Sequence, residues 1–328
     1  MDNLTHSLAG AVLGQMGLKT KTGLAMPTLI IAANIPDIDA VATLLGGHTH
    51  LAIRRGITHG PIALVVLPLI LWAIMLWFDR WQERRGKRPE KRLPVHKGWL
   101  LALAYIGCLS HPAMDWLNVY GIRLLEPFSS QWFYGDTLFI IDIWIWLGLG
   151  FAVLFSLWRE RRKKSWRWPA IAACLLFLIY VGDNRMRTKL TPITYAINEK
   201  VIPNEQNGFH TPPRYARSKL IASPPPFFSW QREIILGDKN NWRLIAPGEI
   251  PAPRFAEPIT DNRCQWPDVE AIRKSNKDLD AFLFWSRAPF AERASDGSVL
   301  IRDARFTDPL VGDRFTVKLA DVRCDELE

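Results

Sequence analysis

The chain has 328 residues, of which 48% are hydrophobic and 22% charged; this composition excludes a disordered or fibrous protein and allows two ordinary domains. The formal net charge of +9 is uneven, because residues 184–328 carry 22 Lys and Arg against 20 Asp and Glu. The excess therefore lies in residues 1–183, together with the long apolar runs. We interpret it as the charge of membrane loops, and we expect no nucleic-acid partner.

Six apolar segments are predicted in this first half, at about residues 4–18, 23–35, 60–78, 98–117, 137–158 and 168–183. The third is a run without one charged side chain, and the fifth contains only Asp142. Runs of that length span a bilayer as single helices. The first two segments are short and can also form a re-entrant hairpin. We expect a mainly α-helical polytopic membrane domain with about five to six apolar helices in residues 1–183.

Basic residues are concentrated in two loops, Arg80 to Lys97 and Arg159 to Arg167. The positive-inside rule assigns these loops to the cytoplasm. It puts the 36–59 loop, the 118–136 loop and everything after residue 183 on the outer side. The sequence therefore predicts a multi-pass protein of the bacterial inner membrane with a periplasmic carboxy-terminal domain.

Residues 184–328 contain short β-type runs separated by Pro and Gly, and they predict a small β-rich soluble domain. Runs at 232–236 and 242–245 predict one hairpin. A second hairpin is expected to pair 281–285 with 298–302, and 314–319 adds a further strand.

The four cysteines divide equally between the two halves. Cys108 and Cys174 lie in apolar segments and are expected to be buried thiols. Cys264 and Cys324 lie in the predicted periplasmic domain, where an oxidising compartment favours a disulfide. Spacing in the sequence does not by itself establish that bridge.

Ionisable residues gather at the ends of four apolar segments, although such residues cost about 2.5–3.5 kcal/mol each at the centre of a membrane helix. The predicted topology puts all four ends on the outer side, so we expect these residues to converge at one membrane depth. Two of them are four residues apart and share one helical face. The proposed ligands are His6, Asp37, Asp39, His59, His111 and Asp115.

Imidazoles and carboxylates are the ligands that one or two divalent ions take in proteins. Two ions about 3.5–4 Å apart would lower the pKa of a bridging water and hold a phosphate or ester oxygen. The set therefore predicts metal-dependent hydrolysis, in which one carboxylate can act as general base instead of ligand. Zinc is the first expectation, followed by manganese or magnesium. Taken singly, a histidine at a helix end is more often a cap or an interfacial side chain, and Asp37 can be a turn residue or helix cap; the prediction therefore rests on the set as a whole.

Other polar residues surround this set. Arg55 is the nearest candidate for binding an anionic substrate group. Asp142 can orient a ligand histidine or pair with Arg123, and Asp2 is assigned to a supporting position beside the ligands. The histidines that we do not predict as ligands are His48, His50, His96 and His210.

These residues resemble the YdjM-like family of membrane-bound, predicted metal-dependent hydrolases over about residues 1–150. One departure is Arg54, where many members have a histidine. The resemblance implies a polytopic inner-membrane hydrolase, names no substrate, and does not extend to the carboxy-terminal part. The matching stretches are Met-Asp-Asn-Leu-Thr-His at 1–6 with Gly10, Asn-Ile-Pro-Asp-Ile-Asp at 34–39, Arg-Gly-Ile-Thr-His at 55–59, His111 with Asp115, Tyr120-Gly121, Pro127-Phe128-Ser129 and Asp142.

A site at the membrane interface meets amphiphiles first, so we expect a lipid-linked, phosphoester or ester substrate and membrane lipids as partners. A protein partner of the outer domain is not identified by the sequence. Two other classes of protein are kept as alternatives to the hydrolase. An ion- or proton-coupled transporter has intramembrane Asp and His, although near the midplane of repeated halves. A non-catalytic membrane anchor would function through its outer domain alone.

Overall fold

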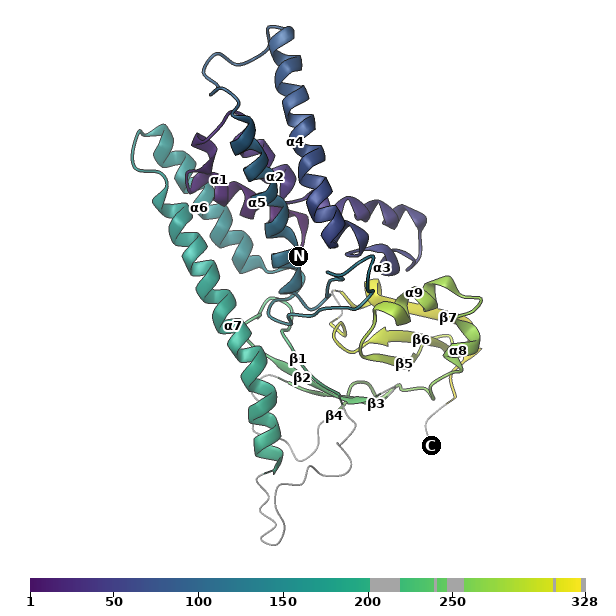
Figure 1. The fold of residues 1–328 in the computed structure, drawn as a ribbon. Helices are drawn as coiled ribbons and strands as arrows, with labels where there is room; N and C mark the ends of the chain where they lie inside the picture. The colour runs from purple at the N-terminus through teal and green to yellow at the C-terminus, as the bar shows by residue number, and fades with distance from the viewer. Residues whose placement is uncertain (201–218, 239–240, 247–256, 309–310, 326–328) are drawn as a thin grey trace. The chain divides into compact units, whose positions relative to one another are not determined.

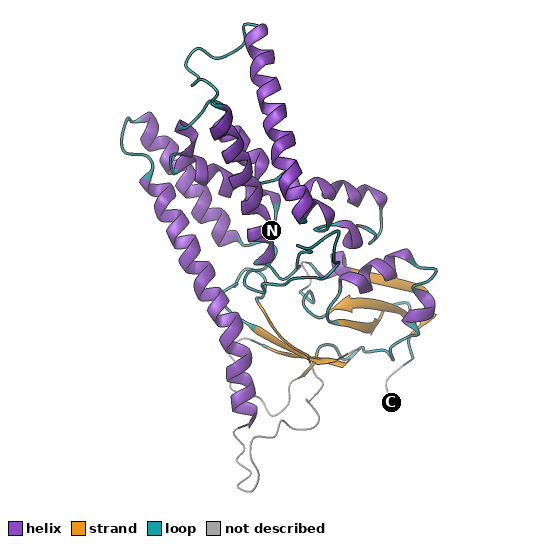
Figure 2. Cartoon of the chain, in the orientation of Figure 1, coloured by secondary structure: helices purple, strands orange, loops and turns teal. Residues whose placement is uncertain are grey.

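The computed structural model describes residues 1–200, 219–238, 241–246, 257–308 and 311–325. The chain divides into two units. The first consists of Met1–Ala40 and Arg54–Asp183, and the second of Val41–Ile53 and Asn184–Glu328. Helices make up the first unit and the strands lie in the second (Figure 1, Figure 2). A helical membrane region followed by a β-rich region confirms the predicted fold class.

Six helices occupy the six predicted apolar segments, and shorter helical elements connect the first of them. These six helices are α1 (Asn3–Gln15), α2 (Ala25–Ala32), α4 (Pro61–Arg84), α5 (Lys97–Trp116), α6 (Ile143–Arg161) and α7 (Trp168–Lys200). The connecting elements are η1 (Leu18–Thr20), η2 (Ile35–Leu45), α3 (His50–Ile53) and η3 (Ile57–His59).

Three helices in the described part of the chain are long and apolar enough to cross a membrane: α4, α6 and residues Trp168–Tyr195 of α7. The pair α2 and η2, bent by 45°, passes the same test as one broken span. The short first two segments were predicted as a re-entrant alternative, and α1 and α2 are indeed only 13 and 8 residues long. α5 is a helix of 20 residues whose buried side chains pack within the unit.

Close packing of α1 and α5 against α2 determines where the ends of α2 and α5 lie. α1 packs against α2, α5 and α6, while α5 lies against both α2 and α4. A Cβ at Gly10 would lie 2.7 Å from the Leu29 carbonyl oxygen, and one at Gly107 would lie 2.6 Å from the Ala32 Cβ. Glycine at these two positions therefore lets α1 and α5 approach the backbone of α2, which brings the ends of α2 and α5 together.

The second unit contains two antiparallel sheets. One has the order β1-β2-β3-β4 and the other β5-β6-β7. The predicted hairpin is confirmed, because β2 pairs with β3 with Leu236 opposite Arg243. The strands are β1 (Lys219–Ser223), β2 (Glu233–Asp238), β3 (Asn241–Ile245), β4 (Glu257–Pro258), β5 (Pro289–Arg293), β6 (Ser298–Asp303) and β7 (Thr316–Arg323). The helical elements among these strands are α8 (Val269–Ile272), α9 (Lys277–Trp285) and η5 (Gly312–Phe315), and α3 belongs to the same unit.

The second predicted hairpin is wrong in one strand. Residues 281–285 belong to α9, and β6 pairs with β5 and β7 instead. Asn276 caps α9 by accepting a hydrogen bond from the Leu279 amide, and two aspartates lie in its first turn. Leu279, Phe282 and Trp285 recur at intervals of three and are all buried, which is a helical spacing. The strand predicted at 314–319 is present as β7, which begins at Thr316.

Two long-range links hold the second unit together. Cys264 and Cys324 form a disulfide. The α3 segment packs against α9, where an Asp278 carboxylate oxygen accepts a hydrogen bond of 2.7 Å from the His48 amide.

The other two cysteines lie in the first unit. Cys108 is a buried free thiol and Cys174 a partly buried one. His210 lies outside the described residues.

Candidate metal centre

Four buried side chains from three elements meet in the first unit. Asp37 comes from η2, and His59 is the last residue of η3, directly before the Gly60-Pro61 start of α4. His111 and Asp115 lie one turn apart near the end of α5 and therefore share a helical face. One ligand atom from each of the four lies within 4.8 Å of the other three. Within the described ranges this is the one such group of His, Cys, Asp and Glu.

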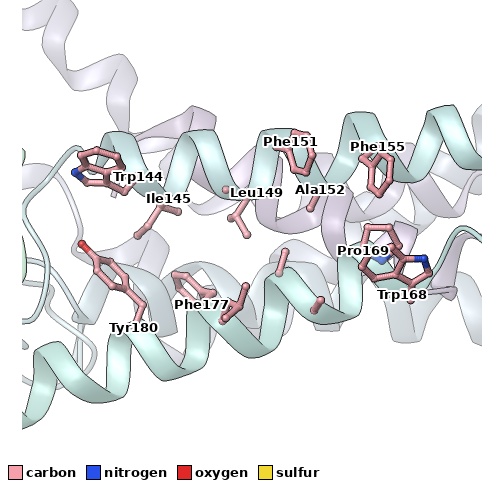
Figure 3. A pocket seen from close by; sticks show the side chains of 14 residues that line it. Trp144, Ile145, Leu149, Phe151, Ala152, Phe155, Trp168, Pro169, Phe177 and Tyr180 are labelled. Carbon is pink, nitrogen blue, oxygen red and sulfur yellow. The ribbon is translucent and has the colours of Figure 1, made fainter.

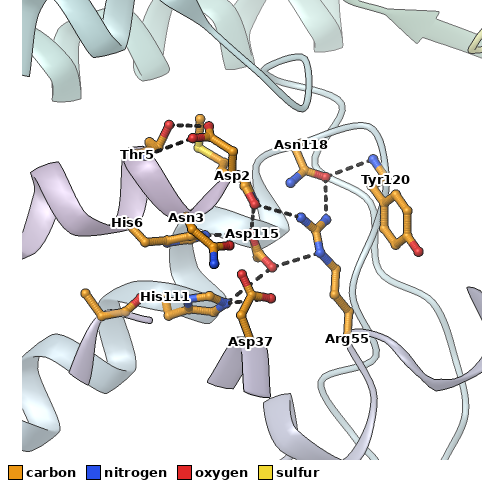
Figure 4. A network of polar contacts seen from close by, with 12 residues as sticks. Asp2, Asn3, Thr5, His6, Asp37, Arg55, His111, Asp115, Asn118 and Tyr120 are labelled. Atoms are coloured by element: carbon orange, nitrogen blue, oxygen red, sulfur yellow. Dashed lines mark hydrogen bonds and ion pairs between the residues drawn. The ribbon is translucent and has the colours of Figure 1, made fainter. Parts of the chain in front are cut away.

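The spacing of these atoms fits one ion. His59 Nε2 is 3.0 Å from His111 Nε2 and 3.8 Å from Asp37 Oδ1. Asp115 Oδ2 lies 3.6 Å from His59 Nε2 and 3.5 Å from His111 Nε2. Ligands of a tetrahedral zinc with bonds of about 2.0–2.1 Å are separated by about 3.3–3.4 Å. The separations of 3.0–3.8 Å bracket this value, so the four atoms are close enough to share one ion. Figure 4 shows the part of this network around His111, Asp37 and Asp115.

The hydrogen bonds behind the two imidazoles also favour a cation. His111 Nδ1 lies 2.7 Å from the Ala33 carbonyl oxygen, which can only accept, so Nδ1 carries the proton. His59 Nδ1 lies 3.4 Å from Asp39 Oδ2, which favours the same tautomer. Two Nε2 lone pairs then face each other across 3.0 Å. A cation between them relieves that repulsion, so these residues fit a metal ion.

Asp39 lies behind His59 and outside the four-atom group. Its Oδ2 accepts hydrogen bonds from the Thr58 hydroxyl at 2.9 Å and from the Arg55 amide at 2.7 Å. The Thr58 hydroxyl is also 2.9 Å from His59 Nδ1. A carboxylate behind a ligand histidine fixes the tautomer and orientation of the ring. The structure therefore places Asp39 as a positioning residue for His59.

His6 lies beside the group rather than in it. Its Nε2 is 3.1 Å from Asp115 Oδ1, the oxygen that also contacts the main-chain nitrogen of Met1. Its ring is stacked on that of His111, with centroids 3.8 Å apart. His6 Nδ1 is buried and has no hydrogen-bond partner. The side chain thus holds Asp115 and leaves one nitrogen free next to the candidate metal ligands.

The two arginines before Gly56 have different environments. Arg55 is buried, and its guanidinium pairs with Asp115 Oδ2 at 2.9 Å and donates to Asn118 Oδ1 at 2.9 Å. It also donates to the main-chain oxygens of Met1 and Gly121. Its contacts therefore suit fixing Asp115 better than the substrate binding expected from the sequence. The side chain of Arg54 is 25% exposed and donates to Asp37 Oδ1 at 3.3 Å.

The two supporting aspartates act as helix caps. Asp2 caps α1 and accepts a hydrogen bond from the Trp146 indole, which ties the start of α1 to α6. Asp142 caps α6 and accepts a hydrogen bond of 2.9 Å from the Tyr180 hydroxyl of α7. Arg123, the expected partner of Asp142, pairs with Glu126 at 2.7 Å. Asp2 therefore links α1 to α6, and Asp142 links α6 to α7.

Three groups of the site were missed from the sequence. Thr58 stands in the Arg-Gly-Ile-Thr-His stretch next to His59, so its position was a usable signal. Asn118 follows Asp115 by three residues and holds the Arg55 guanidinium. The Ala33 carbonyl, which fixes the His111 ring, has no side-chain signal.

Comparison with known proteins gives one match. A family model described as YdjM inner membrane protein matches residues 1–186. No curated protein and no solved structure matches the chain. The matched region is more than half of the chain and includes every residue of the candidate metal centre.

Proposed function

The chain belongs to the YdjM inner membrane protein family, and from this premise we propose that it is a metal-dependent hydrolase acting at the membrane surface. The buried group of Asp37, His59, His111 and Asp115 carries the proposal. Two histidines and two carboxylates suit zinc first, and manganese or magnesium next. In the tautomers inferred above the two Nε2 lone pairs face each other, and a cation at the group relieves their repulsion.

The metal would supply a hydroxide nucleophile at neutral pH by lowering the pKa of a bound water. The protein residues have separate tasks around it. Asp39 and the Ala33 carbonyl fix the two imidazoles, and Arg55 fixes Asp115. Asp37 has one oxygen in the group, while its Oδ2 is buried without a hydrogen-bond partner. We assign this oxygen as the acceptor of the proton from the attacking water.

Arg54 supports an anionic substrate. It is the partly exposed cation at the group, and it contacts Asp37 Oδ1 through a long hydrogen bond of 3.3 Å. A phosphoryl group would give the guanidinium two acceptors in a fork geometry. Together with the inner-membrane family and the candidate spans, this favours a phosphoester or ester of a lipid-linked substrate. We further propose that the centre and the second unit face the periplasm, as the loop charges predict.

The test is metal content followed by hydrolysis. Detergent-purified full-length protein is analysed for metals beside the His59→Ala/His111→Ala double variant, with folding checked by circular dichroism. The matched control, His48→Ala/His50→Ala, removes two histidines outside the group. We expect about one metal ion per chain in the wild type and control, and none in the first variant.

Loaded protein is then screened against phospholipids, lipid-linked phosphates and esters. Product release that requires His59 and His111 supports the hydrolase. Wild-type protein that is metal-free and takes up no zinc, manganese or magnesium refutes the proposal. Metal binding without product release from the whole panel refutes the hydrolase and leaves the transporter, which a flux assay in vesicles would detect.

A further inference from the structure

An apolar groove lies between α6 and α7, away from the candidate metal centre. It has a volume of about 410 Å³ and is lined by 14 residues, all from these two helices (Figure 3). Phe151 and Phe155 line it from α6, and Leu176 and Phe177 from α7. None of the lining residues is Asp, Glu, Lys, Arg or His. The volume falls within the range of small-ligand sites, about 300–1,000 Å³.

The groove is open along its side. Phe151 is 68% exposed and Leu176 is 65% exposed, so the side chains that line the groove remain accessible from outside the protein. Both helices are candidate membrane spans, which puts the opening at the depth of the lipid hydrocarbon. An occupant at this depth must itself be hydrocarbon, because the walls offer almost no polar partner.

The two ends of the groove differ in charge. At one end the Arg159 guanidinium lies 5.4 Å from the centre of the Trp168 ring and 5.8 Å from that of Phe155, and both rings line the groove. Residues 159–167 contain six Lys and Arg but one acidic residue, Glu160, which pairs with Lys19. This end therefore carries excess positive charge.

The other end carries an acidic group. The Tyr180 hydroxyl, a lining group there, donates to Asp142 Oδ2. A ligand phosphate would be repelled at Asp142 and attracted at Arg159, so the charges fix the direction of an amphiphile.

We propose that this groove binds one acyl chain of an anionic phospholipid whose phosphate contacts Arg159. The inference is independent of the metal centre, since none of the four candidate ligands lines the groove. Arg159 Nε donates to the Ser165 carbonyl oxygen, so the loop positions the guanidinium above the two rings. A held lipid would join α6 to α7 along their length.

The glycines of α6 offer a clean test. A Cβ added at Gly148 or at Gly150 meets nothing within 4 Å, so a larger side chain fits at either position. Gly148 lines the groove and Gly150 does not. Gly148→Leu should fill the groove, whereas Gly150→Leu adds the same side chain elsewhere on the same helix. Arg159→Gln and Arg161→Gln form a second matched pair, because Arg161 is exposed at the end of the same helix.

Binding is measured by native mass spectrometry of the full-length protein in a non-ionic detergent. The probes are phosphatidylglycerol and phosphatidylcholine with identical chains. We expect the wild type to bind phosphatidylglycerol about fivefold more tightly, which is the contribution of one basic residue at a lipid surface. Arg159→Gln should reduce this preference to parity, and Gly148→Leu should weaken both lipids at least about fivefold. Gly150→Leu and Arg161→Gln should match the wild type.

Two results would overturn the proposal. One is equal binding of the two lipids by the wild type. The other is equal binding by Gly148→Leu and Gly150→Leu, which would mean that lipids only coat the helices. Circular dichroism of each variant separates a filled groove from a misfolded protein.

Discussion

Asp39 Oδ2 lies 3.4 Å from His59 Nδ1, whereas Asp37 Oδ1 lies 3.8 Å from Nε2 of the same ring. The two aspartates are separated by one residue and stand on opposite sides of the imidazole. η2 is a 3₁₀ helix, in which each residue turns about 120°. Residues two apart therefore point in different directions, one into the four-atom group and one behind its histidine.

Asp39→Asn should weaken metal binding without removing a ligand. The neutral amide orients the His59 ring less firmly, and the loss of such a partner costs about 10–100-fold in affinity. Competition with a chromogenic chelator measures this change. Asp142→Asn is the control, because Asp142 caps α6 and accepts from Tyr180. Equal affinities of the two variants would show that Asp39 does not position His59.

We expect Arg55→Gln to reduce the stability of the fold and Arg54→Gln to weaken substrate binding. Removing the buried Arg55 deletes one of the two ion pairs of the buried Asp115 carboxylate, the other being with the Met1 nitrogen, and this costs up to about 3–5 kcal/mol of stability. Arg54 is partly exposed, and its loss should cost no more than about 1 kcal/mol. Thermal unfolding in detergent gives both values. A KM for an anionic substrate that rises in Arg54→Gln supports the proposed substrate contact, and an unchanged KM contradicts it.

Gly60→Ala should destabilise the first unit. A Cβ at Gly60 would lie 1.9 Å from the Glu126 carbonyl oxygen, and a backbone atom cannot move aside as a flexible side chain can. We expect a loss of about 1–3 kcal/mol. Gly182→Ala in α7 is the control, because its Cβ meets nothing within 4 Å and alanine favours the helix by about 0.5–1 kcal/mol. Similar melting temperatures for the two variants would contradict this account.

Glu233→Gln should stabilise the protein at alkaline pH. Burial, with a further contribution from the Asp308 charge, raises the pKa of Glu233 to about 7. In the unfolded chain the Glu233 carboxyl loses its proton at about pH 4.3, whereas in the folded protein it keeps the proton up to about pH 7. The contribution of Glu233 to the free energy of unfolding therefore falls as the pH rises from about 4 to 7 and stays low above that. The variant should gain about 3–4 kcal/mol at pH 8 and little at pH 4. Melting curves at both pH values measure this, and Glu270→Gln, at an exposed position, should leave the pH dependence unchanged.

The helices could be predicted from the sequence because apolar runs specify them directly. The carboxy-terminal sheets were predicted only in part. Residues 281–285 are apolar and aromatic, which suits a strand or a buried helix, and the deciding signal was Asn276 with the acidic first turn that follows it.

The candidate site was predictable as a set of residues but not as a geometry. Spacing identified Asp37, Asp39 and His6 alike, although only Asp37 joins the four-atom group. Likewise, Arg54 and Arg55 are neighbours in the sequence, and only packing distinguishes the buried Arg55 from the partly exposed Arg54. Burial depends on which helices meet, and that information is spread over the whole first unit.

The inclusion of residues 41–53 in the second unit has a consequence for biosynthesis. His48 and its hydrogen-bond partner Asp278 are separated by 230 positions. A ribosome completes α3 long before it produces α9, so α3 remains without its neighbour while the intervening helices are synthesised. The second unit is therefore the last part to mature, and a premature stop codon anywhere before α9 would leave the early loop without the surface that it packs against.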